Sequence, residues 1–193
     1  IGTLPFFALE TTPRRRLAYN LKTTIEAAFA LFAVVLLSPF LLLIALMIKL
    51  TSKGPVIFKQ LRVGLRGRKF YIYKFRTMVT NAEKLKAALM EFNESDGPAF
   101  KIKNDPRITK IGGFLRKTGL DEVPQLFNVI RGDMSLVGPR PAIPSEVAQY
   151  QPWQRRRLRM RPGLTCLWAV NGRDAVDFET WMKLDMQYID NWS

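Results

Sequence analysis

Two adjacent carboxylates, Asp121 and Glu122, stand in the short apolar stretch "GLDEVPQL" of a strongly basic chain. The 193 residues hold 30 Lys+Arg against 16 Asp+Glu, for a formal net charge of +14, and no histidine. The lack of histidine excludes Ser-His-Asp and Cys-His catalysis within this chain, and a single cysteine argues against a zinc site. Carboxylate chemistry remains, with an oxygen-liganded ion such as Mg²⁺ as its candidate cofactor.

Asp121 opens a predicted helix, "DEVPQLFNVI", and two interpretations of it stay open. As an N-cap it would only stabilise the helix, with a proline tolerated in the first turn. The same position favours an ionised carboxylate and a phosphate docked beside it, and such a carboxylate can attack phosphorus. Arg116 lies five residues upstream, and Arg140 is held between two prolines in "SLVGPRP". Both arginines could bind a phosphate during phosphoryl transfer.

The apolar run 27–48 contains no charged residue and is long enough to cross a bilayer as a helix. Both of its flanks are basic, and the positive-inside rule assigns both to the cytoplasm. Ser38-Pro39 lies at the midpoint, where proline removes a backbone donor. We therefore expect a re-entrant helix broken at Ser38-Pro39, with the Ser38 hydroxyl bonding a freed carbonyl. A kinked spanning helix and a buried helix of a soluble protein are the alternatives.

The next segment, 54–78, predicts a β-hairpin, because Val56-Ile57-Phe58 and the run 70–73 flank the turn-prone "GLRGR". Aromatic and basic residues alternate along its arms. This mixture suits a nucleotide or nucleic acid, and the alternative is a solvated basic face. Further helices are predicted at 81–92 and 107–119, separated by a loop. The Arg-rich segment 145–160 predicts an amphipathic helix, with Trp153 as an interfacial anchor or as part of an ordinary surface helix.

The composition predicts one domain and a polyanionic partner, which could be nucleic acid, an anionic membrane or a phosphorylated substrate. Two functions other than catalysis stay open. The first is a membrane-tethered nucleic-acid binder, which would show steep salt dependence and no need for Asp121. The second is an inactive membrane scaffold. The chain begins with Ile1, so it is expected to be a fragment of a longer protein.

Three stretches resemble the bacterial sugar transferase family, the monotopic phosphoglycosyl transferases. They are "SPFLLLIALMIKLTSKGPVIFKQLRVGLRGRKFYIYKFRTM", "DPRITKIGGFLRKTGLDEVPQLFNVIRGDMSLVGPRP" and "RPGLTCLWAVNGR", and the match runs from about residue 17 to the end. The resemblance implies transfer of a sugar-1-phosphate from a UDP-sugar to polyprenyl (undecaprenyl) phosphate, with release of UMP. It also implies a role in O-antigen, capsule or exopolysaccharide assembly. The expected location is the bacterial cytoplasmic (inner) membrane, with the catalytic domain on the cytosolic face and no nucleic-acid partner.

The resemblance also implies roles for individual residues. Asp121 would attack the sugar-bearing phosphorus and form a covalent phosphosugar intermediate in a ping-pong mechanism. Glu122 would help Asp121 to organise Mg²⁺, or Mn²⁺ in its place. Phosphate binding is expected from Arg116 and Arg140, and the basic residues of the hairpin complete this predicted set: Lys59, Arg62 and Arg76. The break of the family's re-entrant helix falls on Ser38-Pro39.

These expectations define an α+β fold, mostly helical with a small β-hairpin. The predicted divisions are a linker at 1–16, a re-entrant membrane helix at 17–50 and a cytosolic catalytic domain at 51–193. Membrane lipids are expected partners, and a homodimer is left open. Where the family's common "RPGITGWAQVNGR" has Gly, Trp, Ala and Gln, the chain has Cys166, Leu167, Trp168 and Ala169.

Overall fold

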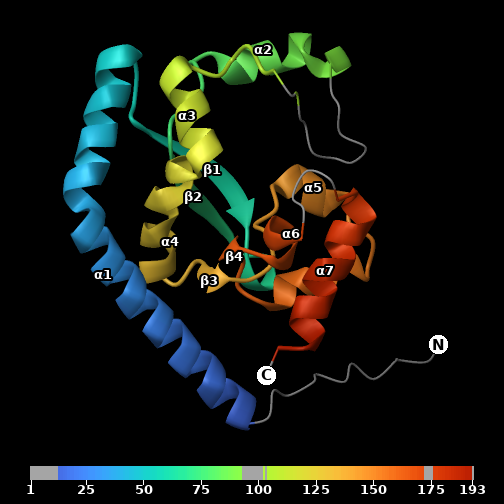
Figure 1. Cartoon of the computed structure of the whole chain (residues 1–193). Coiled ribbons are helices and arrows are strands. Elements are labelled where there is room, and N and C mark those ends of the chain that lie inside the picture. Colours follow the sequence, from blue (N-terminus) through green and yellow to red (C-terminus); the bar gives the residue numbers. More distant parts are fainter. Residues whose placement is uncertain (1–12, 93–101, 103, 172–175, 193) are drawn as a thin grey trace.

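The computed structural model describes residues 13–92, 102, 104–171 and 176–192, without the side chains of 13–16, 86, 87 and 92. It is mostly helical and contains two small two-stranded sheets, which confirms the predicted α+β class. Figure 1 shows the long helix α1 along one side of the molecule, and the β-hairpin between α1 and the helices near the C-terminus. The described part of the chain has one helix long and apolar enough to cross a membrane.

Helix α1 runs from Pro13 to Thr51 without interruption, so it begins within the segment predicted as a linker. The predicted interruption at Ser38-Pro39 is absent, although Figure 1 shows α1 bending about midway along its length. Because Pro39 has no N–H, the Val35 carbonyl four residues earlier loses its usual donor. The Ser38 hydroxyl donates to that carbonyl at 2.8 Å, which confirms the predicted hydrogen bond.

Two hydrophobic clusters attach α1 to the rest of the molecule. Ala30 belongs to the first cluster, and Ile44 and Ile48 belong to the second. The first also contains Phe70, Ile72, Leu126, Val129 and Met134, and the second contains Phe75 and Leu115. Between the two, residues 35–40 are all exposed. The helix is therefore held on either side of its bend and exposes its apolar surface at the bend itself.

The predicted hairpin is confirmed. Strand β1 (Ile57–Val63) pairs antiparallel with β2 (Lys69–Phe75), in a register that runs from Ile57 opposite Phe75 to Val63 opposite Lys69. The connecting turn, η1 (Leu65–Gly67), has φ 55° at Arg66 and φ 78° at Gly67. Two successive positive φ angles are typical of the type I′ turns that match the twist of a hairpin.

Helix α2 (Ala82–Ala88) and the 3₁₀ turn η2 (Met90–Phe92) confirm the helix predicted at 81–92, whereas most of the predicted loop lies outside the described residues. Helix α3 (Lys110–Thr118) ends at Gly119, which adopts φ 73°. A side chain at Gly112 would collide with the Thr77 carbonyl, so glycine is needed for α3 to approach this backbone. This approach fixes the helix that leads into the carboxylate pair.

The carboxylate pair lies in η3 (Leu120–Gln125), a 3₁₀ helix that continues into α4 (Leu126–Ile130). The predicted N-cap at Asp121 is wrong. Gly119 occupies the cap position, without a side-chain cap hydrogen bond, and Asp121 lies inside the first turn. The left-handed Gly119 that ends α3 also caps η3, so the cap lies two residues earlier than the helix pattern suggests.

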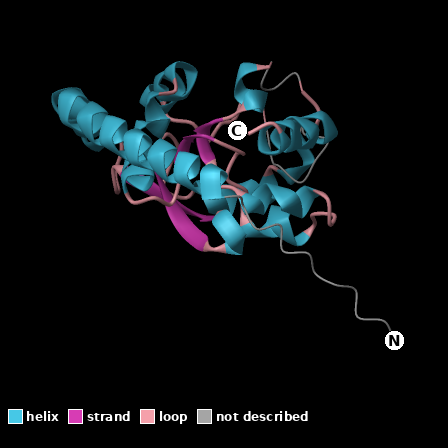
Figure 2. Cartoon of the chain, turned by 90° about the horizontal axis from the view of Figure 1, so that it is seen from below, coloured by secondary structure: helices cyan, strands magenta, loops and turns pink. Residues whose placement is uncertain are grey.

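The C-terminal part contains a parallel pair that the sequence did not predict: β3 (Ser135–Val137) beside β4 (Gly163–Thr165). The single helix predicted at 145–160 is wrong. It is divided into α5 (Pro144–Ala148) and η4 (Gln154–Arg159), since Pro152 cannot continue a helix. Two helices follow, α6 (Leu167–Val170) and α7 (Phe178–Asp190). Figure 2 shows the molecule from below, with the strands lying among the helices.

Candidate active site

The carboxylates of Asp121 and Glu122 differ in their surroundings. Asp121 is 8% exposed, so most of its side chain is removed from water. Glu122 is half-buried and accepts a hydrogen bond from Lys74, whose Nζ lies 2.5 Å from Glu122 Oε1. A lysine from the hairpin thus meets the second carboxylate of the pair, and the site is built from two elements far apart in the sequence.

Side chains along β2 alternate between the two faces of the strand, and this alternation places Lys74 at the site. Phe70 and Ile72 are buried on the face of β2 that packs against the core, and Lys74 follows on the same face. Asn128 of α4 holds the strand in place from its open edge. Its Nδ2 donates to the Tyr71 carbonyl at 2.7 Å, and its Oδ1 accepts from the Tyr73 N–H at 3.2 Å.

Burial and charge shift the three ionisable groups in different directions. Burial raises the pKa of Asp121, against the opposing effect of the Lys74 charge. Burial would also raise the pKa of Glu122, but the charge and hydrogen bond of Lys74 outweigh it and hold that pKa below its usual range. The Lys74 pKa is lowered by burial, although Glu122 counteracts this. The helix terminus was expected to favour ionised Asp121, whereas burial dominates in the structure.

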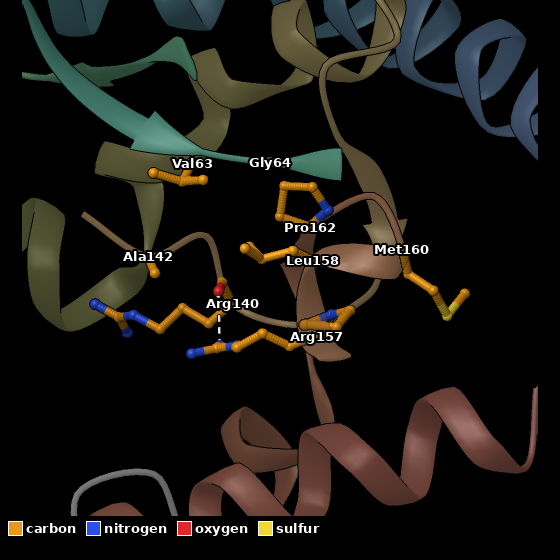
Figure 3. A pocket seen from close by; sticks show the side chains of 9 residues that line it. Val63, Gly64, Arg140, Ala142, Arg157, Leu158, Met160 and Pro162 are labelled. Carbon is orange, nitrogen blue, oxygen red and sulfur yellow. Dashed lines mark hydrogen bonds between the residues drawn. The ribbon is translucent and has the colours of Figure 1, made fainter. Parts of the chain in front are cut away.

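Arg140 follows β3 and is half-buried, and its charge acts on both Glu122 and Lys74. Its guanidinium carbon lies 5.0 Å from the ring centroid of Trp168 and 5.8 Å from that of Trp181. Figure 3 shows Arg140 beside Arg157, whose Nη2 donates to the Arg140 carbonyl at 2.8 Å. Arg140, which was predicted to bind phosphate, therefore lies near enough to the carboxylate pair for its charge to lower the pKa of Glu122.

Arg62 of β1 lies next to this group. Its Nη1 donates to the Pro141 carbonyl at 2.8 Å and its Nη2 to Gln60 Oε1 at 2.5 Å, while its buried Nε has no hydrogen-bond partner among the described residues. Burial, followed by the charge of Arg140, lowers the pKa of Arg62 to about 10. Two cations whose charges act on each other in a partly buried site would be stabilised by a bound anion.

The remaining predicted phosphate ligands lie in three different environments. Arg116 is exposed in the last turn of α3, and its charge lowers the pKa of Asp121. Lys59 is exposed, with its Nζ 5.8 Å from the centroid of the Tyr73 ring. Arg76 is buried and donates to the Ser52 carbonyl at 2.8 Å and to the Ser52 hydroxyl at 2.6 Å. Arg76 thus ties the end of α1 to the hairpin, and its interactions do not reach the carboxylate pair.

No group of three or more His, Cys, Asp or Glu able to hold a metal ion occurs within the described ranges. The Asp121–Glu122 pair still offers two carboxylates. Mg²⁺ is commonly bound by one or two carboxylates together with substrate phosphates and water, so this donor set fits a Mg²⁺ that arrives with a phosphorylated substrate.

Lys74 and Asn128 are the residues that sequence reasoning left out of the site. Residues 70, 72 and 74 lie on one face of the predicted strand. This pattern could have identified Lys74, because a lysine on the core face of a strand needs a partner. For Asn128 the signal was weaker. It is a polar residue six residues after Glu122, and its role depends on which strand edge packs against it.

Comparison with known proteins gives the family. The family model described as bacterial sugar transferase matches residues 17–193. The galactosyl transferase CpsE of Streptococcus agalactiae serotype III (strain NEM316) is 52% identical over 141 residues, which are 72% of this chain and 31% of the relative. The undecaprenyl-phosphate galactose phosphotransferase of Salmonella typhimurium (strain LT2) is 43% identical over 93% of this chain and 38% of the relative.

A shorter relative is matched almost throughout. The exopolysaccharide production protein ExoY of Rhizobium meliloti (strain 1021) is 41% identical over 98% of this chain and 86% of its own length. The chain spans only about a third of the first two relatives. The family model covers all described residues from Leu17 onward, including the carboxylate pair and its cations. The chain belongs to the bacterial sugar transferase family.

Proposed function

We propose that this chain transfers a sugar-1-phosphate from a UDP-sugar to undecaprenyl phosphate and releases UMP. The observation that carries the proposal is the convergence of cations on one carboxylate pair. Lys74, Arg140 and Arg116 all act electrostatically on Asp121 or Glu122. Relatives named as undecaprenyl-phosphate galactose phosphotransferase and UDP-glucose:undecaprenyl-phosphate glucose-1-phosphate transferase support this substrate class.

The proposed chemistry is a double displacement on one phosphorus atom. A carboxylate oxygen of Asp121 bonds to the sugar-bearing phosphorus, the bond from that phosphorus to the bridging oxygen breaks, and UMP leaves with the electron pair. A phosphate oxygen of the polyprenyl acceptor then attacks the same phosphorus. The bond to Asp121 breaks, and the carboxylate is regenerated. Neither nucleophile must lose a proton near neutral pH once ionised, so no histidine is required.

The cations have distinct parts in this proposal. Lys74 keeps Glu122 ionised and counteracts the burial of Asp121, so that a carboxylate is available to attack. Arg140 and Arg62 would neutralise the diphosphate, because charge on the transferred phosphoryl group needs stabilisation by fixed cations. Asp121 and Glu122 would hold Mg²⁺, which would supply further charge neutralisation on the phosphates. Within the part of the chain that the structure describes, the contacts of Lys59 with Tyr73 and of Arg76 with Ser52 do not link either residue to the carboxylate pair.

We also propose that α1 is a re-entrant membrane helix on the cytosolic face of the inner membrane. Just before the apolar run 27–48, Glu26 accepts a hydrogen bond from the Ser135 hydroxyl at 2.6 Å. Beyond the apolar run, Ser52 accepts from Arg76. Both ends of the run thus contact one globular body. A straight helix of 22 residues would carry them about 33 Å apart across the bilayer. The exposed bend at 35–40 supports entry into one leaflet only.

The proposal is tested by UMP release from a panel of UDP-sugars with undecaprenyl phosphate in detergent. The parent chain should release UMP and Asp121→Asn should be inactive. Asp133→Asn should retain activity, because among the described residues the Asp133 carboxylate forms its ion pair with Arg131 and not with the cations of the site. EDTA should stop the reaction and Mg²⁺ should restore it. Absence of UMP release with every donor would reject the proposal. Tight salt-dependent binding of nucleic acid would then favour the rival function.

A further inference from the structure

The guanidinium of Arg140 lies against two indole rings. Its Cζ is 5.0 Å from the centroid of Trp168 and 5.8 Å from that of Trp181. The two rings lie 5.4 Å apart at an interplanar angle of 34°, so they form one continuous aromatic surface. A guanidinium within about 6 Å of an indole centroid is attracted to the ring face.

Arg140 is also fixed through its backbone. Arg157 Nη2 donates to the Arg140 carbonyl, and Arg157 pairs with Asp185 of α7 at 2.5 Å. The Arg157 guanidinium carbon lies 5.1 Å from the Trp181 centroid. Arg157 and Asp185 are both 1% exposed at their side chains, so this anchor is rigid and shielded from water. The aromatic surface and the buried ion pair therefore hold the side chain and the backbone of the same residue.

Trp168 lies in the four-residue stretch 166–169, where this chain departs from the pattern common in the family. It is half-buried and belongs to neither of the two hydrophobic clusters found among the described residues. Its ring packs on the buried Trp181 and also lies beside the cation Arg140. Besides its packing role, Trp168 therefore presents an aromatic face to this guanidinium.

We propose that Trp168 and Trp181 are positioning residues that hold the Arg140 guanidinium in the pose that receives the diphosphate of the donor. This inference rests on the proposed function, because it presumes that Arg140 binds substrate phosphate. A guanidinium whose face rests on an indole ring still directs its N–H groups outward in the guanidinium plane, where a phosphate can accept hydrogen bonds from them. Loss of the Trp168 face leaves Arg140 with more freedom and weakens its contact with the transferred group.

A double-mutant cycle tests this with Trp168→Leu and Arg140→Gln, using donor-dependent UMP release from the full chain in detergent. Trp168→Leu should lower kcat/KM by roughly three- to tenfold, the size expected for losing one cation–π contact. Trp168→Tyr should recover part of the loss, since it restores an aromatic face. In the Arg140→Gln background, Trp168→Leu should have no further effect. Trp153→Leu, a tryptophan of the same chain away from Arg140, should leave kcat/KM unchanged.

A structural readout separates the inference from the proposed function. In arginine-labelled protein, the Arg140 Nε–H resonance should carry a ring-current shift that Trp168→Leu reduces and Trp153→Leu leaves unchanged. An unchanged Arg140 resonance in Trp168→Leu, or an equal loss of kcat/KM in both backgrounds, would overturn the inference. Normal activity of Arg140→Gln would instead refute the proposed role of Arg140 in binding the donor.

Discussion

At the carboxylate pair, burial and charge act against each other. Burial favours the protonated form of Asp121, whereas a nucleophile must be ionised to attack phosphorus. Lys74 opposes that effect, and it pairs with Glu122 rather than with Asp121. The ion pair of Lys74 therefore does not engage the oxygens of Asp121. In this arrangement Lys74 lowers the pKa of both carboxylates, against the effect of burial, and Glu122 holds Lys74 in position.

The Lys74→Met variant should lose activity most severely at low pH. Lys74 lowers the pKa of both Asp121 and Glu122, so its removal raises both, and the acidic limb of the kcat/KM profile moves to higher pH. We expect kcat/KM at pH 7 to fall by about tenfold or more. The measurement is kcat/KM for UMP release from pH 5 to 9. Lys69→Met on the exposed end of β2 is the control, and an acidic limb at the parent position in Lys74→Met would contradict this account.

A second residue prediction concerns the turn of the hairpin. Arg66 adopts φ 55°, a region that costs most L-residues roughly 1 kcal/mol and that asparagine tolerates. Arg66→Asn produces the Asn-Gly pair preferred in type I′ turns, so it should raise the free energy of unfolding by up to about 1 kcal/mol. Urea unfolding in detergent measures the change. Arg68→Asn, at an ordinary φ of −63°, should give no gain, and equal effects of both variants would argue against turn strain.

At the scale of elements, the contact between β2 and the helix η3–α4 determines the geometry of the site. Asn128 is 0% exposed and satisfies two backbone groups on the open edge of β2. Lys74 lies one residue beyond Tyr73, and the carboxylate pair lies in η3, which leads directly into the helix α4 that carries Asn128. Any shift between these elements would separate Lys74 from Glu122.

Asn128→Ala should therefore be strongly destabilising. It leaves the part-buried Tyr71 carbonyl and Tyr73 N–H without their side-chain partner, at a cost of up to about 1–3 kcal/mol for each group. The free energy of unfolding from urea titration measures the loss. Asn171→Ala removes an exposed side-chain hydrogen bond to the Leu167 carbonyl and should cost less than about 1 kcal/mol. Similar losses of unfolding free energy in the two variants would show that the hydrogen bonds from Asn128 to β2 are not important for stability.

The sequence predicted those elements that local patterns determine. The hairpin followed from β-rich runs around a glycine-containing turn, and the end of α3 followed from Gly119. The β3–β4 pair could not be predicted, because each strand has three residues and depends on a partner far along the chain. The same limit applied to the site. Asp121 and Glu122 were visible as neighbours, but the pairing of Lys74 with Glu122 requires knowing that β2 packs on η3.

At the scale of the whole molecule, we predict the membrane topology of α1, because this helix is attached to the rest of the chain on both sides of its bend. Single cysteines replacing Asn20 and Lys53, with Cys166 changed to serine, should both resist an impermeant thiol reagent in intact cells and react after lysis. Changing Ser38-Pro39 to Ala-Leu should produce a straight apolar run of about 20 residues, enough to span, and expose one end. Labelling of either end of the parent from outside would show that α1 spans the membrane.

The central claim is that Asp121 carries the phosphosugar between donor and acceptor. The most direct measurement is the mass of the peptide containing Asp121 after the chain has been incubated with a UDP-sugar and Mg²⁺ but without acceptor. The account predicts release of UMP, up to one equivalent per chain, and a matching gain of one phosphosugar on that peptide. Undecaprenyl phosphate should remove the added mass, and Asp121→Asn should never acquire it. UMP release that requires both substrates together, with an unmodified Asp121 peptide, would contradict the covalent mechanism.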